Sequence, residues 1–191
     1  MQTNQEIAAS YFKRLSVSLK SIPLKPLSEL ASKIEETRDL KGSVLICGNG
    51  GSSATASHMQ VDLAFGVTPG VRARCLNDNS ASLTSTGNDL SFDEVFSRQI
   101  ELEADPRDLL IVISASGNSK NLLLAVAAAS RIGVTTSAIV GFDGGKLKLG
   151  VDIPIHCPTE TADYGVAEDL HASINHALKE ILNGGLASKA P

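Results

Sequence analysis

The sequence has no tryptophan, and its aromatic share is only 4%. Proteins that bind single-stranded nucleic acid stack bases on aromatic side chains, and this chain has few to offer. Lysine and arginine form no run, and the formal net charge is -4. We therefore exclude nucleic acid and anionic membrane surfaces as partners, because neither would find a basic patch. An anionic ligand must be held by local groups.

Long apolar runs are missing as well. No segment approaches the roughly 18 apolar residues of a membrane span, and the opening hexapeptide lacks the basic start and apolar stretch of a signal peptide. We expect a soluble protein of the cytoplasm. The three cysteines, Cys47, Cys75 and Cys157, show no CxxC spacing. They argue against a disulfide framework or a cysteine-rich zinc site and are expected to be reduced core residues.

What is present is the composition of an ordinary globular domain, with 191 residues of which 42% are hydrophobic. Apolar residues recur every four positions from Ile7 to Leu19, which predicts an amphipathic helix. A second helix is expected to start near Pro26, so that the two form an N-terminal helical hairpin. We predict one domain over residues 1–191, with 1–41 as the helical extension and 42–185 as an α/β core.

From residue 43 onward, short continuous apolar runs replace the helical periodicity. Such runs are typical of parallel strands covered by helices on both faces. The expected strands are 43–47, 71–76, 109–113, 136–140 and 151–155. Helices are expected at about 52–64, 92–104, 119–132 and 166–183, the second with a capping box made by Ser91 and Glu94. Strand alternating with helix predicts a doubly wound, five-stranded parallel sheet.

A glycine-rich turn follows the first expected strand and opens a helix. Its sequence is Cys47-Gly48-Asn49-Gly50-Gly51-Ser52-Ser53. Glycines permit tight turns, and the free N–H groups of a helix start bind anions. The turn lacks the Gly-Lys-Ser/Thr ending of a P-loop and does not match GxGxxG. Taken alone, it is also compatible with an ordinary βα connection that binds nothing.

A second turn of the same kind follows the third expected strand, with the sequence Ser114-Ala115-Ser116-Gly117-Asn118-Ser119. A single serine-rich turn is more often capping chemistry than a ligand site. Two such turns at the carboxyl ends of parallel strands, however, lie where open α/β sheets bind ligands. Together they favour a phosphorylated small molecule.

These motifs resemble those of the SIS (sugar isomerase) domain family and, within it, the phosphoheptose isomerases. The resemblance runs from about Val44 to about Ile181. Besides the two turns, it includes Gly87-Asn88-Asp89, Phe96-Ser97-Arg98-Gln99 and Gly141-Phe142-Asp143-Gly144-Gly145-Lys146.

The resemblance implies a homotetramer with active sites at subunit interfaces. It also implies the conversion of sedoheptulose 7-phosphate to D-glycero-D-manno-heptose 7-phosphate. The serines of the second turn would hold the phosphate, while the first turn and the Asn-Asp pair would contact the sugar. The substrate-binding residues carried over are Asn49, Gly50, Gly51, Ser52, Asn88, Asp89, Ser114, Ala115, Ser116, Ser119 and Glu168.

Aldose–ketose interconversion moves a proton between adjacent carbons, so it needs a base near carbon and assistance at the oxygens. His58 and Asp62 are four residues apart and share one helix face. Glu168 and His176 lie within about 80° of each other on the last expected helix. Two imidazoles and two carboxylates suit zinc or a similar divalent metal. A His–Asp pair at this spacing is also common on solvated helix faces.

The resemblance assigns acid and base duties to Asp62 and His176, but with two departures. The family pattern has glutamate at the position of Asp62 and glutamine at that of Glu168. The added charge of Glu168 favours a cation and, without one, repels a phosphate. The two changes are compatible with geometric compensation of one by the other, and equally with a paralogue that acts on another long-chain sugar phosphate. His171 and His156 are expected to be structural.

Three functions stay open on the sequence. The first is an isomerase of a seven- or eight-carbon ketose phosphate. The second is a non-catalytic SIS protein that binds a sugar phosphate or a protein partner, such as a replication initiator; the retained acid and base residues speak against it. The third is a lyase that cleaves sugar ethers, and the short chain disfavours it.

Overall fold

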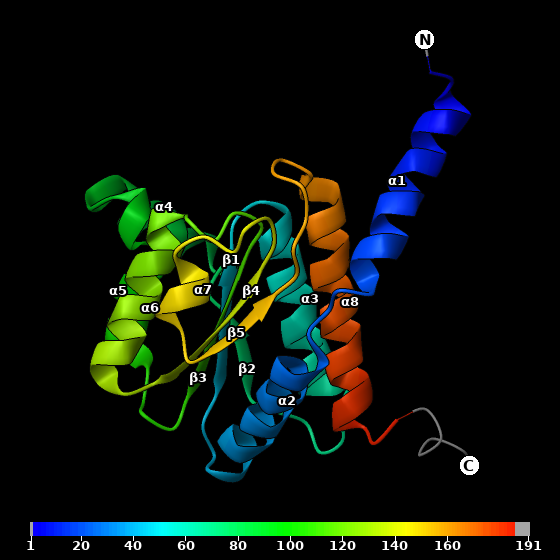
Figure 1. Cartoon of the computed structure of the whole chain (residues 1–191). Coiled ribbons are helices and arrows are strands. Elements are labelled where there is room, and N and C mark those ends of the chain that lie inside the picture. Colours follow the sequence, from blue (N-terminus) through cyan, green and yellow to red (C-terminus); the bar gives the residue numbers. More distant parts are fainter. Residues whose placement is uncertain (1, 186–191) are drawn as a thin grey trace.

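The computed structural model describes residues 2–185, and within this range the chain forms one five-stranded parallel sheet in the order β2-β1-β3-β4-β5 (Figure 1). Every strand pair is parallel, which confirms the predicted sheet. All five strands lie where the apolar runs predicted them, with shifts at their ends. Their bounds are β1 Val44–Gly48, β2 Ala73–Cys75, β3 Leu109–Ser114, β4 Thr135–Val140 and β5 Ile153–His156.

Helices cover both faces of the sheet, so alternate strand residues enter two separate cores. Val44 and Ile46 of β1 face α2, α3 and α8, whereas Leu45 and Cys47 face α5, α6 and α7. Figure 1 shows these two layers on opposite sides of the strands. The helices are α1 Asn4–Leu19, α2 Leu24–Asp39, α3 Gly51–Phe65, α4 Ser80–Asp89, α5 Ser97–Glu103, α6 Lys120–Ile132, α7 Leu147–Gly150 and α8 Tyr164–Leu182.

The predicted helix over 92–104 is wrong in detail, because the chain breaks it into a short 3-10 helix, η1 (Phe92–Glu94), and α5. The predicted capping box is also wrong, since the Ser91 side chain makes no capping hydrogen bond. Val95 and Phe96 are fully buried at the break, so their burial overrides the local capping signal. Helix α4 was not predicted, because it is rich in serine and threonine rather than amphipathic.

The two N-terminal helices both pack on α8, and α2 also reaches the sheet. Helix α1 starts with a capping box between Thr3 and Glu6, and none of its residues is buried. Two polar contacts tie it to α8 and the turn before it: the Tyr11 hydroxyl donates to Asp169 at 2.5 Å, and Arg14 pairs with Asp163 at 2.7 Å. In Figure 1 it projects past the sheet, so one side of it is uncovered in the single chain.

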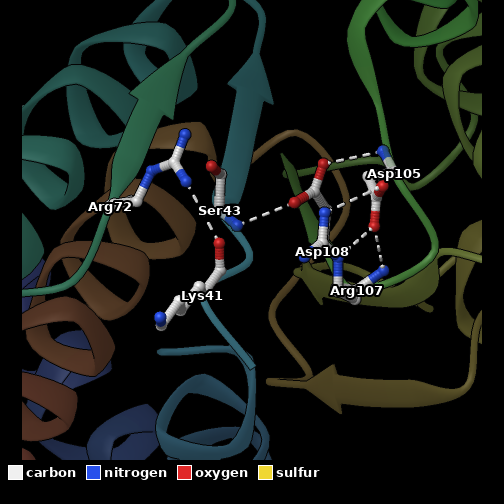
Figure 2. A network of polar contacts seen from close by, with 6 residues as sticks. All are labelled: Lys41, Ser43, Arg72, Asp105, Arg107 and Asp108. Atoms are coloured by element: carbon white, nitrogen blue, oxygen red, sulfur yellow. Dashed lines mark hydrogen bonds and ion pairs between the residues drawn. The ribbon is translucent and has the colours of Figure 1, made fainter. Parts of the chain in front are cut away.

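At the amino ends of the strands, the buried Asp108 carboxylate joins two segments (Figure 2). It accepts from the Ser43 backbone N–H before β1 at 2.7 Å and from the Asp105 N–H before β3 at 2.9 Å. Arg107 holds Asp105 in turn, and Arg72 donates to the Lys41 carbonyl at 3.1 Å. This network aligns β1 and β3, whose opposite ends carry the two glycine- and serine-rich turns.

Replacement of Asp108 by asparagine should destabilise the fold, because an amide cannot accept at both oxygen positions and one buried N–H loses its partner. We expect the free energy of unfolding to fall by about 1–3 kcal/mol, measured by urea denaturation. Asp105→Asn, at an exposed side chain of the same network, should shift the midpoint much less. Equal losses in the two variants would contradict this role of Asp108.

Candidate functional site

A cavity of about 290 Å³ lies at the carboxyl ends of β1 and β3, between the two turns. Its walls combine backbone and hydroxyl groups of both turns with side chains from the start of α8. The lining residues are Asn49, Gly50, Gly51, Ser52, Ile113, Ser114, Ala115, Ser116, Ser119, Tyr164 and Glu168. All the predicted substrate contacts except Asn88 and Asp89 are among them.

Three helix N-termini meet at this cavity. Gly51 begins α3, Ser119 is the N-cap of α6 and Tyr164 begins α8, and all three residues line the cavity. Each helix start presents unpaired N–H groups and the positive end of a helix dipole. The arrangement therefore favours a negatively charged group, such as a phosphate.

The first turn depends on Gly50, whose φ of 55° precedes the start of α3. This backbone conformation is strained for residues with a side chain. The neighbouring Asn49 amide is held across the cavity by Asn121 of α6, and each side chain donates to the other at 2.9 Å. The first turn is thus linked to the first turn of α6, the helix that follows the second turn.

The second turn depends on Gly117, which has a φ of 64° and lies against the Gly144 carbonyl, where a Cβ would overlap. Two serine hydroxyls stabilise the turn from within. Ser114 accepts from the Gly117 N–H at 3.0 Å, and Ser116 accepts from the Asn118 N–H at 3.3 Å. As acceptors to the backbone, both hydroxyls keep their own protons for donation to a ligand.

Glu168 and Tyr164 form the α8 wall of the cavity. A Cβ at Gly51 would overlap the Glu168 carboxyl group, so this carboxylate lies directly at the N-terminus of α3, where a negative charge is favoured. The Tyr164 ring packs edge-on against Phe142, with 5.1 Å between ring centroids. Reasoning from the sequence missed Tyr164 and Ile113. The i,i+4 spacing of Tyr164 to Glu168 on one helix was the available signal for the tyrosine.

A second cluster lies further along α3 and α8, where His58, Asp62 and His176 bring one ligand atom each within 4.8 Å of one another. The His58 Nε2 is 3.4 Å from Asp62 Oδ2, and the two imidazole rings meet edge-on with centroids 5.2 Å apart. Glu168 is not part of this group. The structure thus brings together three of the predicted metal ligands and leaves the fourth in the cavity.

The Asp62 carboxylate is buried, but polar side chains of α8 form hydrogen bonds with both of its oxygens. Asn175 donates to Oδ2 at 2.8 Å, and the Lys179 ammonium lies 2.6 Å from Oδ1. Burial raises the pKa of Asp62, but the hydrogen bonds from Lys179 and Asn175 and the nearby charges outweigh it, so its pKa is lowered. Asp62 is therefore ionised at neutral pH.

The remaining predicted residues lie apart from both centres. Asn88 and Asp89 end α4, where they are exposed and joined by a hydrogen bond of 2.8 Å. His156 contacts the Phe142 carbonyl at 3.0 Å, in keeping with a structural role. His171 is fully buried on α8, and neither ring nitrogen has a hydrogen-bond partner among the described residues.

Helices on both faces of a parallel sheet, with a cavity at the carboxyl ends of its strands, define an α/β protein built to hold a small anionic ligand. Residues 10–141 match the family model of the SIS domain. The chain belongs to the SIS domain family, which confirms the resemblance seen in its motifs.

Within this family, the chain is similar to proteins named phosphoheptose isomerase, both in sequence and in structure. It is 38% identical over 162 residues to the phosphoheptose isomerase of Chlorobaculum parvum, covering 82% of this chain and 77% of the relative. It is also 38% identical over 164 residues to that of Trichlorobacter lovleyi, covering 84% and 83%. The structure of the Neisseria gonorrhoeae phosphoheptose isomerase matches with a TM-score of 0.87 and 30% identity, over 95% of this chain and 100% of that one.

The buried His171 should make the protein less stable in mild acid. Burial lowers the pKa of His171 from 6.5 to about 4, so below pH 6.5 the unfolded chain takes up a proton that the folded chain does not. The free energy of unfolding should fall between pH 6.5 and 4, by up to about 3 kcal/mol from this residue. His171→Leu should flatten that fall, measured by urea denaturation across this range.

The matched control is Ile174→Val, a buried change on the same helix without an ionisable group. It should lower stability by the same amount at every pH. If His171→Leu kept the pH dependence of the parent, the histidine would not be its source.

Proposed function

We propose that this protein isomerises a phosphorylated long-chain ketose, with sedoheptulose 7-phosphate as the substrate and D-glycero-D-manno-heptose 7-phosphate as the product. The observation that carries the proposal is the pairing of two centres along α3 and α8. One is a cavity ringed by three helix N-termini, and the other is the His58–Asp62–His176 cluster. The relatives named phosphoheptose isomerase support the same activity.

In this proposal the phosphate binds at the second turn, where Ser116 and Ser119 donate hydroxyl hydrogens and α6 begins. The sugar chain then extends along the α3–α8 groove toward the cluster. Asn49 and Glu168 offer an amide and a carboxylate to its hydroxyl groups. Gly51 and His58 are separated by about two helical turns, or about 10 Å. That distance favours a long sugar over a triose.

The chemistry requires one proton to leave carbon 1 while oxygen 2 gains one, which gives the enediol. Carbon 2 then gains a proton while oxygen 1 loses one, which gives the aldose. Asp62 and His176 are the acid and base that we assign to these transfers. The lowered pKa of Asp62 keeps the carboxylate ionised near neutral pH, which is the form that can accept a proton. His176 is exposed beside it, so a substrate in the groove can reach its imidazole.

We further propose that the cluster binds a divalent metal, with zinc as the best fit to its donors. Two imidazole nitrogens and one carboxylate are a common zinc set, and a fourth position would stay open to substrate or to a displaced Glu168. When bound, such an ion would polarise the sugar oxygens and stabilise their negative charge. His58 would then serve to hold the ion rather than to transfer protons.

A homotetramer with sites at subunit interfaces is part of the same proposal. Helix α1 exposes Ile7, Phe12 and Val17, an apolar set that a second copy of the chain would cover. Asn88 and Asp89 lie outside the cavity of their own chain, so a neighbouring subunit is the natural route by which they would reach a substrate. The three buried, unpaired cysteines are consistent with a reducing, cytoplasmic location.

Loss of either proposed phosphate contact should weaken substrate binding. Ser116→Ala and Ser119→Ala each remove a hydroxyl donor to an anion, so affinity for the phosphorylated sugar should fall about ten- to a hundredfold. Calorimetric titration with sedoheptulose 7-phosphate and with unphosphorylated sedoheptulose measures this. The unphosphorylated sugar serves as the control, since its weak binding should not change. Unaltered affinity in both variants would exclude the second turn as the phosphate site.

Turnover itself is tested by incubating the purified protein with sedoheptulose 7-phosphate and following the aldose product by NMR. Asp62→Asn and His176→Asn should abolish product formation and keep the fold, whereas Asp39→Asn at an exposed position should be fully active. Full activity of Asp62→Asn would refute the catalytic assignment. Binding without turnover in the parent protein would instead identify a non-catalytic sugar-phosphate binder.

A further inference from the structure

The Asp62 carboxylate already has a cation beside it. The Lys179 ammonium lies 2.6 Å from Oδ1, and the Asn175 amide donates to Oδ2 at 2.8 Å. The Asp62 side chain is only 6% exposed and that of Lys179 is 35% exposed. This pair is therefore better shielded from water than an ordinary surface ion pair.

The fold provides a place for this ammonium at the end of α3. Gly66 is the C-cap of α3. A Cβ there would lie 2.7 Å from the Lys179 Cε and 2.9 Å from its Nζ. The glycine therefore leaves the room that the lysine occupies. The C-terminal end of a helix carries a partial negative charge, which also favours a cation at this point. The Asp62 carboxylate and the negative end of the α3 dipole thus both attract the Lys179 ammonium group and hold it in this position.

The same contacts stand in the way of a metal ion. Lys179 occupies Oδ1, while Asn175 and His58 both face Oδ2. A divalent ion bound to Asp62 would have to share the carboxylate with Lys179 and Asn175 or displace one of them. It would also lie close to a fixed positive charge, which repels it.

We propose that Lys179 is a built-in counter-ion that competes with divalent metal for Asp62 and so limits the metal affinity of the His58–Asp62–His176 cluster. The inference rests on the proposed metal site. It gives Lys179 a positioning role: the lysine holds the Asp62 carboxylate in place when no metal is bound, and it must yield Oδ1 or share the carboxylate when one binds.

The test is a zinc titration of the purified full-length protein against a chromogenic chelator, repeated with cobalt and followed by absorption. Lys179→Met should bind both ions about tenfold more tightly or better, the factor that corresponds to one hydrogen bond to a charged group. Lys179→Arg keeps the positive charge and should keep the parent affinity. Lys120→Met is the matched control, because it removes a lysine that pairs with Asp93 at the same 2.6 Å but lies on α6, which covers the other face of the sheet.

Thermal unfolding provides the second measurement, since Lys179→Met leaves a buried carboxylate without its partner. The variant should melt below the parent without metal and gain more from added zinc. Lys179→Gln replaces the methionine variant if the latter does not fold; it keeps a donor to Asp62 but removes the positive charge, so it should also bind zinc more tightly than the parent. Equal metal affinity in the parent and the methionine or glutamine variant overturns the competition and leaves the metal site standing. Absence of binding in every protein, with isomerase activity retained, overturns the metal site and the competition together but not the isomerase function.

Discussion

Helices α3 and α8 lie side by side, and their contact positions the groups to which we assign proton transfer and metal binding. At one level Gly51 meets Glu168 in the cavity, and further along Asp62 meets Asn175 and Lys179. The sheet fixes where α3 begins, since α3 follows directly from β1. The register of α8 against α3 then decides which side chains of the two helices meet in the cavity and which meet in the His58–Asp62–His176 cluster. A shift of one turn between these helices would separate the carboxylate from its partners.

The charges on α8 also match the dipole of α3 at both of its ends. The Glu168 carboxylate lies at the N-terminus, beside Gly51, and the Lys179 ammonium lies at the C-terminus, beside Gly66. Each is the sign that the helix dipole favours at that end. In the proposals above, the sugar hydroxyl groups bind beside the first of these charges, and a metal ion competes with the second.

Much of the architecture could be predicted because buried parallel strands and helix-opening turns leave local signatures. Continuous apolar runs located the strands, and the glycines and serines between them located the cavity. Helix α4 escaped prediction because the capping Asn79 side chain and packing support it and no apolar stripe marks it. The break before α5 escaped because it depends on the burial of Val95 and Phe96, which no local pattern encodes.

For the candidate site, the sequence by itself determined which side chains share a helix face, because the periodicity of a helix is local. It therefore paired His58 with Asp62 on one helix and related Glu168 to His176 on another. Only the tertiary structure decided that His176 joins the first pair while Glu168 lies at the start of α3. Contacts between helices depend on the register in which two buried faces pack, and that register is set by the whole core and by no single segment.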